Sequence, residues 1–493
     1  MKHIHKFTEL GAFALLAACE VGPDYVSPEV EAPAAYKEAS APDASQNVTD
    51  KGDWHPAKPD DAADRGAWWS VYNDAALGGL EKQVDISNQN LKASAAAYRQ
   101  ARALVEEARA GLFPAATVGV GENRQGGGAS IGGAKNIYTA SVGASWVPDL
   151  WGRVRRTIES NIANAQASAA DLASARLAAQ SALAADYFAL RAQDELKDLL
   201  DATVEDDQKA LQIVQNQYDQ GVAAKADLLA AQTQLEAVQA GAINVGVSRA
   251  QLEHAIAVLT GKPPAELTIP PAPLAKEVPE APSGLPSALL ERRPDIAAAE
   301  RLAASANAQI GVAISAWYPD LTLTASYGYT GPSLGNLLTQ PNSLWAFGPQ
   351  IAETIFDAGL REAQVEAAKA VYDQEVATYR QTVLTGFQQV EDQLAALRIL
   401  AQQQQAEEQT VADAHKTEEL VLNQYKEGTV PYSSVLTAQT TTLTAEQAAL
   451  TVRASRFNAS VVLIEALGGG WDVSQINEEP AENNSDRAEP DKN

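Results

Sequence analysis

Two segments of the chain alternate strictly between apolar and small polar residues, which is the pattern of a strand with two different faces. In residues 138–146, Tyr, Ala, Val, Ala and Trp alternate with Thr, Ser, Gly and Ser. In residues 321–330, Leu, Leu, Ala, Tyr and Tyr alternate with Thr, Thr, Ser, Gly and Thr. We therefore expect β-hairpins near residues 114–148 and 319–356. Such strands suit a membrane barrel with lipid outside and water inside, and they equally suit a hairpin on a soluble core.

Long helices are predicted between these strands. Residues 150–219 contain no Pro and only Gly152, so one continuous helix would be about 100 Å long. Residues 77–112 form a further predicted helix, which ends before Pro114. From residue 227 apolar residues recur every 3.5 positions on average, which indicates coiled-coil packing. The two heptad positions hold Leu228, Leu235, Ala242, Arg249 and Ile256, and Ala231, Val238, Val245, Leu252 and Leu259.

The chain is a tandem duplication of about two hundred residues. Residues 216–261 and 423–468 share 13 identities over 46 ungapped positions, at an offset of 428 − 221 = 207. Gly221 and Gly428 lie at equivalent positions, where each long helix is expected to reverse into its partner. Each copy is therefore predicted to be a β-hairpin joined to a long coiled-coil helix hairpin, which gives a mixed α/β fold.

The predicted organisation along the chain has six segments. They are a lipoprotein signal peptide (1–18), an extended segment (19–76), the first repeat (77–261), a Pro-rich linker (262–286), the second repeat (287–468) and an acidic tail (469–493). Two copies supply four strands, and four strands cannot close a barrel. If the strands face lipid, their edges must pair between subunits, because unpaired backbone groups are not tolerated in hydrocarbon. Two subunits would give a filled barrel of eight strands, whereas three would give twelve strands and a lumen.

Composition narrows the class of protein. The 37 Lys and Arg against 63 Asp and Glu give a net charge of −26, which disfavours nucleic acid as a partner. The single Cys excludes a disulfide scaffold. That Cys ends the sequence Leu16-Ala17-Ala18-Cys19, behind an apolar stretch and two lysines, which resembles a lipoprotein signal. We expect a covalent lipid on Cys19 and no other cofactor; the alternative is an ordinary apolar helix with a lone buried Cys.

No catalytic or metal-binding motif is found in the sequence. The five His residues are scattered, and no HExxH, GxSxG or phosphate-cradling Gly-Lys-Ser/Thr segment is present. The acid pairs Asp206-Asp207 and Glu418-Glu419 are predicted to lie on solvated helix faces. We expect a protein that is not an enzyme and that has neither catalytic nor metal-ligating residues.

Several segments together resemble the outer membrane factor family, specifically its TolC-like, NodT-type lipoproteins. They are Val21-Gly22-Pro23-Asp24-Tyr25 after the lipobox, Arg292-Arg293-Pro294-Asp295-Ile296, Tyr318-Pro319, and Ile355-Phe356-Asp357-Ala358-Gly359. The resemblance implies a homotrimer with a 12-stranded β-barrel in the outer membrane, continued by a periplasmic α-helical barrel. It implies an exit duct of a tripartite efflux system of the RND type, working with a periplasmic adaptor and an inner-membrane transporter. A type I secretion duct is an alternative within the same family.

The same resemblance assigns roles to the two hairpin tips. It implies a periplasmic gate in which Tyr425 bonds Asp227, and an adaptor contact at Gly221, Val222, Gly428 and Thr429. Asp227 can also be explained as a helix cap, and the glycines by turn geometry alone. The sequence departs from the family pattern where Val430 replaces an Arg, and where Ser434 and Thr437 replace aspartates. A strongly cation-selective entrance is therefore not expected.

A function from another class stays open at this point. A lipid-anchored periplasmic coiled-coil scaffold without a pore would also fit the helices. It would leave five aromatic residues of the strands with nothing to bury them, namely Trp146, Tyr327, Tyr329, Trp345 and Phe347. The duct is therefore the preferred interpretation, with a substrate that the sequence does not identify.

Overall fold

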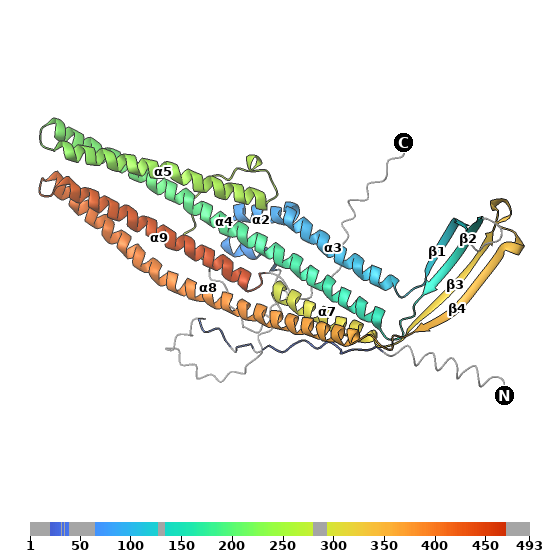
Figure 1. Ribbon diagram of the computed structural model, residues 1–493. Helices are drawn as coiled ribbons and strands as arrows, with labels where there is room; N and C mark the ends of the chain where they lie inside the picture. Colours follow the sequence, from blue (N-terminus) through green and yellow to red (C-terminus); the bar gives the residue numbers. More distant parts are fainter. Residues whose placement is uncertain are drawn as a thin grey trace, which may run out of the picture. The chain divides into compact units, whose positions relative to one another are not determined.

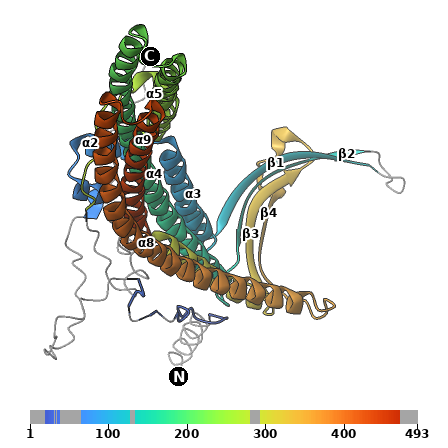
Figure 2. The same ribbon diagram turned by 90° about the vertical axis from the view of Figure 1, so that its left-hand side faces the viewer.

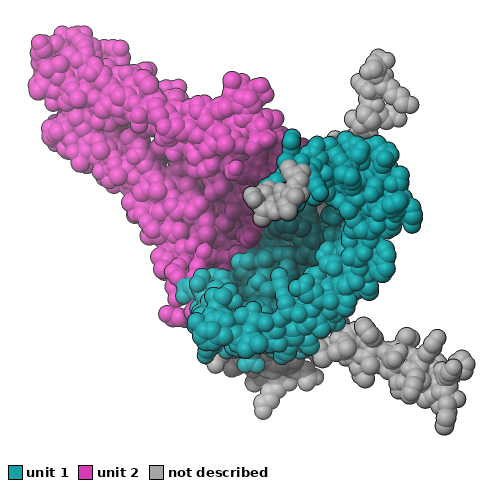
Figure 3. All heavy atoms as spheres, turned by 45° about the vertical axis from the view of Figure 1, so that its right-hand side comes forward, with its two compact units in different colours: residues 1–30, 96–169, 298–381 teal, residues 31–95, 170–297, 382–493 magenta. Residues whose placement is uncertain are grey.

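The structure is a computed structural model that describes residues 20–30, 32–33, 35–38, 65–126, 134–279 and 293–469. These residues divide into two compact units, each assembled from separate stretches of the chain (Figure 3). Unit 1 comprises residues 1–30, 96–169 and 298–381, and unit 2 comprises residues 31–95, 170–297 and 382–493. Each sequence copy contributes its strands and the first part of its long helix to unit 1, and the rest of its helix hairpin to unit 2, so the repeats are not spatial domains. The predicted segment boundaries stay predictions, and Cys19 lies outside the described residues.

Unit 1 contains a four-stranded antiparallel sheet in the order β1-β2-β3-β4. The sheet is strongly curved (Figure 2). Its strands are β1 (Ala115–Gln125), β2 (Lys135–Trp146), β3 (Asp320–Gly331) and β4 (Ser343–Ala352). The central pair joins the second strand of one sequence copy to the first strand of the other. Strands β1 and β4 are the two edges, and neither has a partner on its outer side among the described residues.

The strand register brings the apolar residues into continuous rows across the sheet. One row runs Val118, Val142, Tyr327 and Trp345 over all four strands. These side chains are between 51% and 77% exposed. The alternating row consists of Thr117, Gly143, Ser326 and Ala346, so the opposite face is small and weakly polar. The period-two pattern thus produces one exposed apolar face and one hydrophilic face.

Four long helices reproduce the sequence repeat. Helices α4 (Arg153–Asp219) and α8 (Leu360–Lys426) have 67 residues each, and α5 (Lys225–Leu259) and α9 (Tyr432–Ala466) have 35 each. Both pairs are offset by the same 207 residues, since 360 − 153 and 432 − 225 are equal. Helix α5 lies along α4, and α9 lies along α8 (Figure 1). The prediction of one unbroken helix before Gly221 is confirmed.

The predicted helix over residues 77–112 is in fact two helices. Helix α2 (Ala75–Ser87) ends and α3 (Gln89–Ala110) begins at Asn88. The Asn88 side chain accepts hydrogen bonds from the N–H groups of Asn90 and Leu91 at 2.9 and 3.1 Å. It also donates to the carbonyl of Leu259 at 2.8 Å. The single-helix prediction was wrong here because a long-range contact at Asn88 stabilises the break.

The remaining helix and the short helical turns complete the fold. The second copy begins with α7 (Pro294–Ser315), and α2 is preceded by the 3-10 helix η1 (Arg65–Tyr72). Three further 3-10 turns are η2 (Pro264–Glu266), η4 (Leu334–Asn336) and η5 (Gln340–Asn342). Among the described residues, no helix combines the length and apolar character needed to cross a bilayer.

The core of unit 2 is aromatic and lies where η1 and α2 meet α4 and α9. Phe188 stacks on Phe457 with ring centroids 4.7 Å apart, and Tyr72 packs 4.8 Å from Phe188. The proline-rich segment is bound to α4 and α5 by two arginines, since the buried Arg191 and the half-buried Arg249 donate to its carbonyls at 2.7 and 2.6 Å. This packing holds the long helices in a defined position, which in turn positions their tips.

Residues 21–24 of unit 1 are held by one buried arginine. Arg156, at the start of α4, donates to the carbonyl of Val21 at 3.2 Å and pairs with Asp24 at 3.1 Å. Gly22 has φ +104°, and a Cβ there would lie 2.5 Å from the Cα of Gly311. Close packing against α7 therefore requires a glycine at this position.

Candidate functional site

Both helix hairpins turn through the same backbone motif. At the first tip, the N–H of Gly221 donates to the carbonyl of Tyr218 and the N–H of Val222 to that of Gln217, both at 2.8 Å. This is the paired bonding of a Schellman motif, and Gly221 has the positive φ of +76° that the motif needs. The second tip repeats both bonds 207 residues later, around Gly428 with φ +74°. No atom lies within 4 Å of a Cβ built on either glycine, so the backbone angle alone requires Gly.

The four residues predicted to contact an adaptor are all exposed in the chain. Val222 is 74% exposed, and Gly221, Gly428 and Thr429 are exposed as well. An exposed apolar side chain on a tight turn is available for a partner at little conformational cost. The adaptor contact itself stays a prediction.

Tyr425 connects the two hairpins, but through a residue that the sequence analysis missed. Its hydroxyl donates to Oε1 of Gln217 at 2.5 Å, from α8 to α4. Its ring is buried and packs 5.3 Å from the ring of Tyr432 on α9. Burial raises the pKa of Tyr425, and the nearby Asp227 raises it further, so the hydroxyl stays a neutral donor at neutral pH.

Asp227 makes a different bond within the chain. It lies in the first turn of α5, and its carboxylate accepts from the N–H of Ala224 at 3.4 Å. This is one half of a capping box, because Ala224 has no side-chain oxygen to return the bond. The carboxylate lies near enough to Tyr425 to influence its pKa. The direct bond between Tyr425 and Asp227 is thus not formed in the single chain, and the gate role stays a prediction.

The internal repeat contains a sequence signal that could have pointed to Gln217 as a tip residue. Asn216-Gln217-Tyr218 and Asn423-Gln424-Tyr425 are the same tripeptide at the two tips. In the first tip Tyr218 is 37% exposed, whereas in the second Tyr425 is buried and crosses to the other hairpin. The first copy therefore supplies the hydrogen-bond acceptor, Gln217, and the second copy supplies the donor, Tyr425.

The residues that differ from the family pattern at the entrance have apolar or uncharged side chains. Val430 packs against the tip cluster formed by Val214, Leu228, Ala231, Tyr425, Tyr432 and Val435. Helix α9 also has a series of threonines whose hydroxyls donate to the carbonyl four residues earlier, namely Thr437, Thr440, Thr441, Thr444 and Thr451. With the donors satisfied inside the helix, these side chains present methyl groups and oxygen acceptors without charge.

The expectation that both acid pairs are solvated is wrong for one residue. Asp206 and Glu419 are exposed, and Glu418 is half-buried. Asp207 is only 4% exposed, and its Oδ2 has no hydrogen-bond partner among the described residues. Asp207 projects from the face of α4 that packs inside the bundle, whereas Asp206 is turned about 100° away around the helix.

Comparison with known proteins identifies the family. The family model described as outer membrane efflux protein matches residues 80–262 and 285–469, which covers both sequence copies. The chain belongs to the outer membrane efflux protein family. Its relatives include the toluene efflux pump outer membrane protein TtgC of Pseudomonas putida, 32% identical over 93% of this chain and 94% of TtgC.

Solved structures support the same assignment. The outer-membrane channel OprN is similar over 92% of this chain and 100% of its own, with 27% identity and a TM-score of 0.82. The MtrE outer membrane channel of Neisseria gonorrhoeae, solved in an open state, covers 92% of this chain and 98% of its own, with 27% identity and a TM-score of 0.76. This efflux protein therefore has the TolC-like channel fold and acts in the outer membrane as an exit duct.

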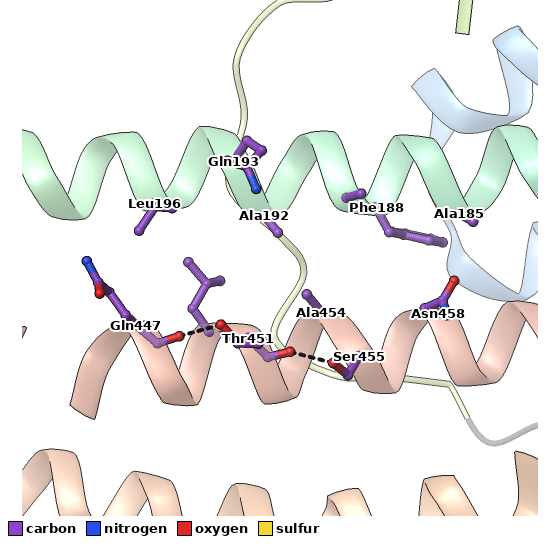
Figure 4. Close-up of a pocket in the computed structure, with 12 residues that line it drawn as sticks. Ala185, Phe188, Ala192, Gln193, Leu196, Gln447, Thr451, Ala454, Ser455 and Asn458 are labelled. Carbon is purple, nitrogen blue, oxygen red and sulfur yellow. Dashed lines mark hydrogen bonds between the residues drawn. The ribbon is translucent and has the colours of Figure 1, made fainter. Parts of the chain in front are cut away.

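A groove lies between two of the duct's long helices. It has a volume of about 490 Å³ and runs between α4 and α9 (Figure 4). Phe188, Leu196 and Leu450 supply its apolar surface, and the small side chains of several alanines leave the space between the helices open. Its polar groups are uncharged amides and hydroxyls, including Gln193, Gln447 and Asn458. Among the described residues, no charged residue lines this groove, whereas Glu407 lines the hollow beside the threonines of α9.

Proposed function

We propose that this efflux protein works as a homotrimer and is the passive exit duct of a tripartite pump of the RND type. The observation that carries the proposal is the exposed apolar row from Val118 to Trp345, which spans all four strands between two open edges. An apolar face of this extent needs lipid or a partner to cover it. Open edges cannot remain unpaired in hydrocarbon, so each must meet the edge of another copy.

Three copies satisfy both requirements. They supply 3 × 4 = 12 strands, which close into a barrel wide enough for a lumen. In each copy the strands β1 and β4 run in opposite directions, so neighbouring copies pair antiparallel as the rest of the sheet does. The long helices of three copies then form the periplasmic α-helical barrel. A lipid on Cys19 anchors each copy to the same membrane.

The hairpin tips form the entrance on the periplasmic side. In this proposal Tyr425 and Asp227 hold the tips closed, and an adaptor that docks on Gly221, Val222, Gly428 and Thr429 opens them. The contact of Tyr425 with Gln217 supports the proposal, because it already joins one hairpin to the other. Energy comes from the inner-membrane transporter, and the duct itself performs no chemistry.

Uncharged organic molecules are the substrates that the groove between α4 and α9 favours. The relative TtgC is named for toluene, an uncharged aromatic solvent. Glu407 lies beside the threonines of α9, whereas the groove beside Phe188 offers apolar and weakly polar contacts with no charged side chain among its described lining residues. Such surfaces attract apolar molecules weakly and release them readily, as passive conduction needs.

Single-channel conductance in planar bilayers tests the proposal. The folded trimer of wild type is compared with Tyr425→Phe combined with Asp227→Ala, and with Tyr218→Phe as the matched control at the other tip. We expect a small wild-type conductance that grows clearly in the double variant and stays unchanged in the control. A conducting wild type with an unchanged double variant would refute the gate and keep the duct. No conductance from a folded trimer would refute the duct and favour the scaffold.

A further inference from the structure

Asp207 lies at a position where all four tip helices meet. It projects from α4 into the bundle and is 4% exposed. Gln234 on α5 and Glu418 on α8 both lie near enough to influence the pKa of Asp207, and the charge of Asp207 in turn raises the pKa of Tyr432 on α9. One ionisable carboxyl is therefore placed in the contact between the two hairpins that form the tips.

Among the described residues, the groups that influence Asp207 supply no positive charge. On its own helix the neighbour is Asp206, whose carboxylate is occupied by Lys209 at 2.8 Å. From α8 comes Glu418, another acid, and from α9 the neutral phenol of Tyr432. His415 on α8 pairs instead with Glu446 on α9, at 2.9 Å. Oδ2 of Asp207 has no hydrogen-bond partner among the described residues, so the ionised form is poorly stabilised.

We propose that Asp207 is a proton-controlled latch between the two helix hairpins. In its protonated form the carboxyl is neutral and lets α4 pack against α8. In its ionised form it repels Glu418 across the contact and needs water, so the hairpins separate and the entrance opens more readily. This inference rests on the proposed function, because it takes the tips as the entrance of a duct.

The direction of the pH effect follows from the titration of Asp207. Burial, and then the charges of Glu418 and Asp206, raises its pKa to about 6. When the hairpins separate, water reaches the carboxyl and its pKa falls towards the ordinary 3.8. Opening therefore releases a proton, and it is favoured as pH rises. The opening equilibrium increases between about pH 4 and pH 6 and is level above that range.

Conductance measured between pH 4.5 and 7.5 tests the latch. We expect the open fraction of wild type to rise about tenfold or more over this range, since one pKa unit corresponds to about tenfold. Asp207→Asn keeps the shape but cannot ionise, so it should stay mostly closed and lose the pH dependence. Glu418→Gln should reduce the dependence, because one of the repelling charges is gone. Asp198→Asn and Glu419→Gln change exposed acids on the same two helices and should retain the wild-type profile.

A second measurement decides the latch even if the duct proposal fails. Spin labels at Gln220→Cys and Glu427→Cys, both exposed near the tips, report the distance between the hairpins in the purified protein. We expect the distance distribution to lengthen from pH 4.5 to 7.5, and this change to vanish when Asp207→Asn is added. Equal pH profiles with and without Asp207→Asn, in conductance or in distance, would overturn the latch. A protein that never conducts but whose tips separate with pH would overturn the duct alone.

Discussion

At the scale of single residues, the most unusual feature of the part of the chain that the structure describes is a carboxyl group that is buried without a hydrogen-bond partner. Glu81 in α2 is fully buried, and neither carboxylate oxygen has a hydrogen-bond partner among the described residues. Burial, with the charge of Asp85 adding to it, raises the pKa of Glu81 to about 9 from an ordinary 4.5. The folded protein therefore holds this proton more tightly than the unfolded chain does. Protonation of Glu81 therefore stabilises the folded protein fully below about pH 4.5, and this contribution is lost as pH rises towards 9.

Replacing Glu81 tests that account of stability. We expect Glu81→Leu to raise the free energy of unfolding at pH 8 by about 1–3 kcal/mol, because leucine leaves no unpaired buried carboxyl and no group whose ionisation at this pH favours the unfolded chain. At pH 5 the difference should be much smaller. Thermal unfolding followed by circular dichroism at both pH values measures it, with exposed Glu236→Gln as the control. A wild type whose stability does not fall between pH 5 and pH 8 would contradict the raised pKa.

At the scale of elements, the tips depend on glycine for its backbone angle and the helix interiors do not. We expect Gly428→Ala to destabilise the second tip by about 1 kcal/mol, since a residue with a Cβ is strained at the positive φ of +74°. Gly428→Asn should cost less, because Asn tolerates that region. Gly246→Ala in α5 should have the opposite sign and stabilise by about 0.5–1 kcal/mol, since its Cβ meets nothing within 4 Å.

Hydrogen exchange locates these effects within the elements. The amide of Thr429 bonds to the carbonyl of Gln424 at 3.0 Å, so its protection reports the second turn directly. Gly428→Ala should speed its exchange while leaving that of Val222 at the other tip unchanged. Equal protection in wild type and variant would mean that the turn does not need the glycine.

Elements with a strong internal pattern were predictable from the sequence, and long-range contacts were not. The 207-residue repeat and the alternation of residues 321–330 led to the long helices and the strands with two faces. The break at Asn88 depends on the carbonyl of Leu259, which no local pattern reveals. Asp207 was misjudged for the same reason, because its neighbour Asp206 is solvated and adjacent acids look alike in sequence. The two turn glycines were predicted, but the Gln217 partner of Tyr425 was not, since a neutral Gln gives a weak signal.

At the scale of the whole molecule, the apolar and hydrophilic faces of the sheet require different surroundings. Val142 lies in the exposed apolar row of β2, and its neighbour Ser141 points to the opposite face beside Gly119 and Gly328. In a trimeric barrel the first side chain meets lipid and the second meets water. In a soluble scaffold neither would lie in a bilayer.

Arginine placed at these two neighbours separates the two assemblies. We expect Val142→Arg to cost about 2–4 kcal/mol per copy if it lies near the bilayer midplane, and Ser141→Arg to cost little. The trimer that resists detergent in outer-membrane fractions should therefore be lost in Val142→Arg and retained in Ser141→Arg, as gel migration before and after heating would measure. Retention of the trimer in both variants would mean that lipid does not cover this face. Because the residues are adjacent in one strand, a general weakening of the sheet would affect both, and only a difference in surroundings separates them.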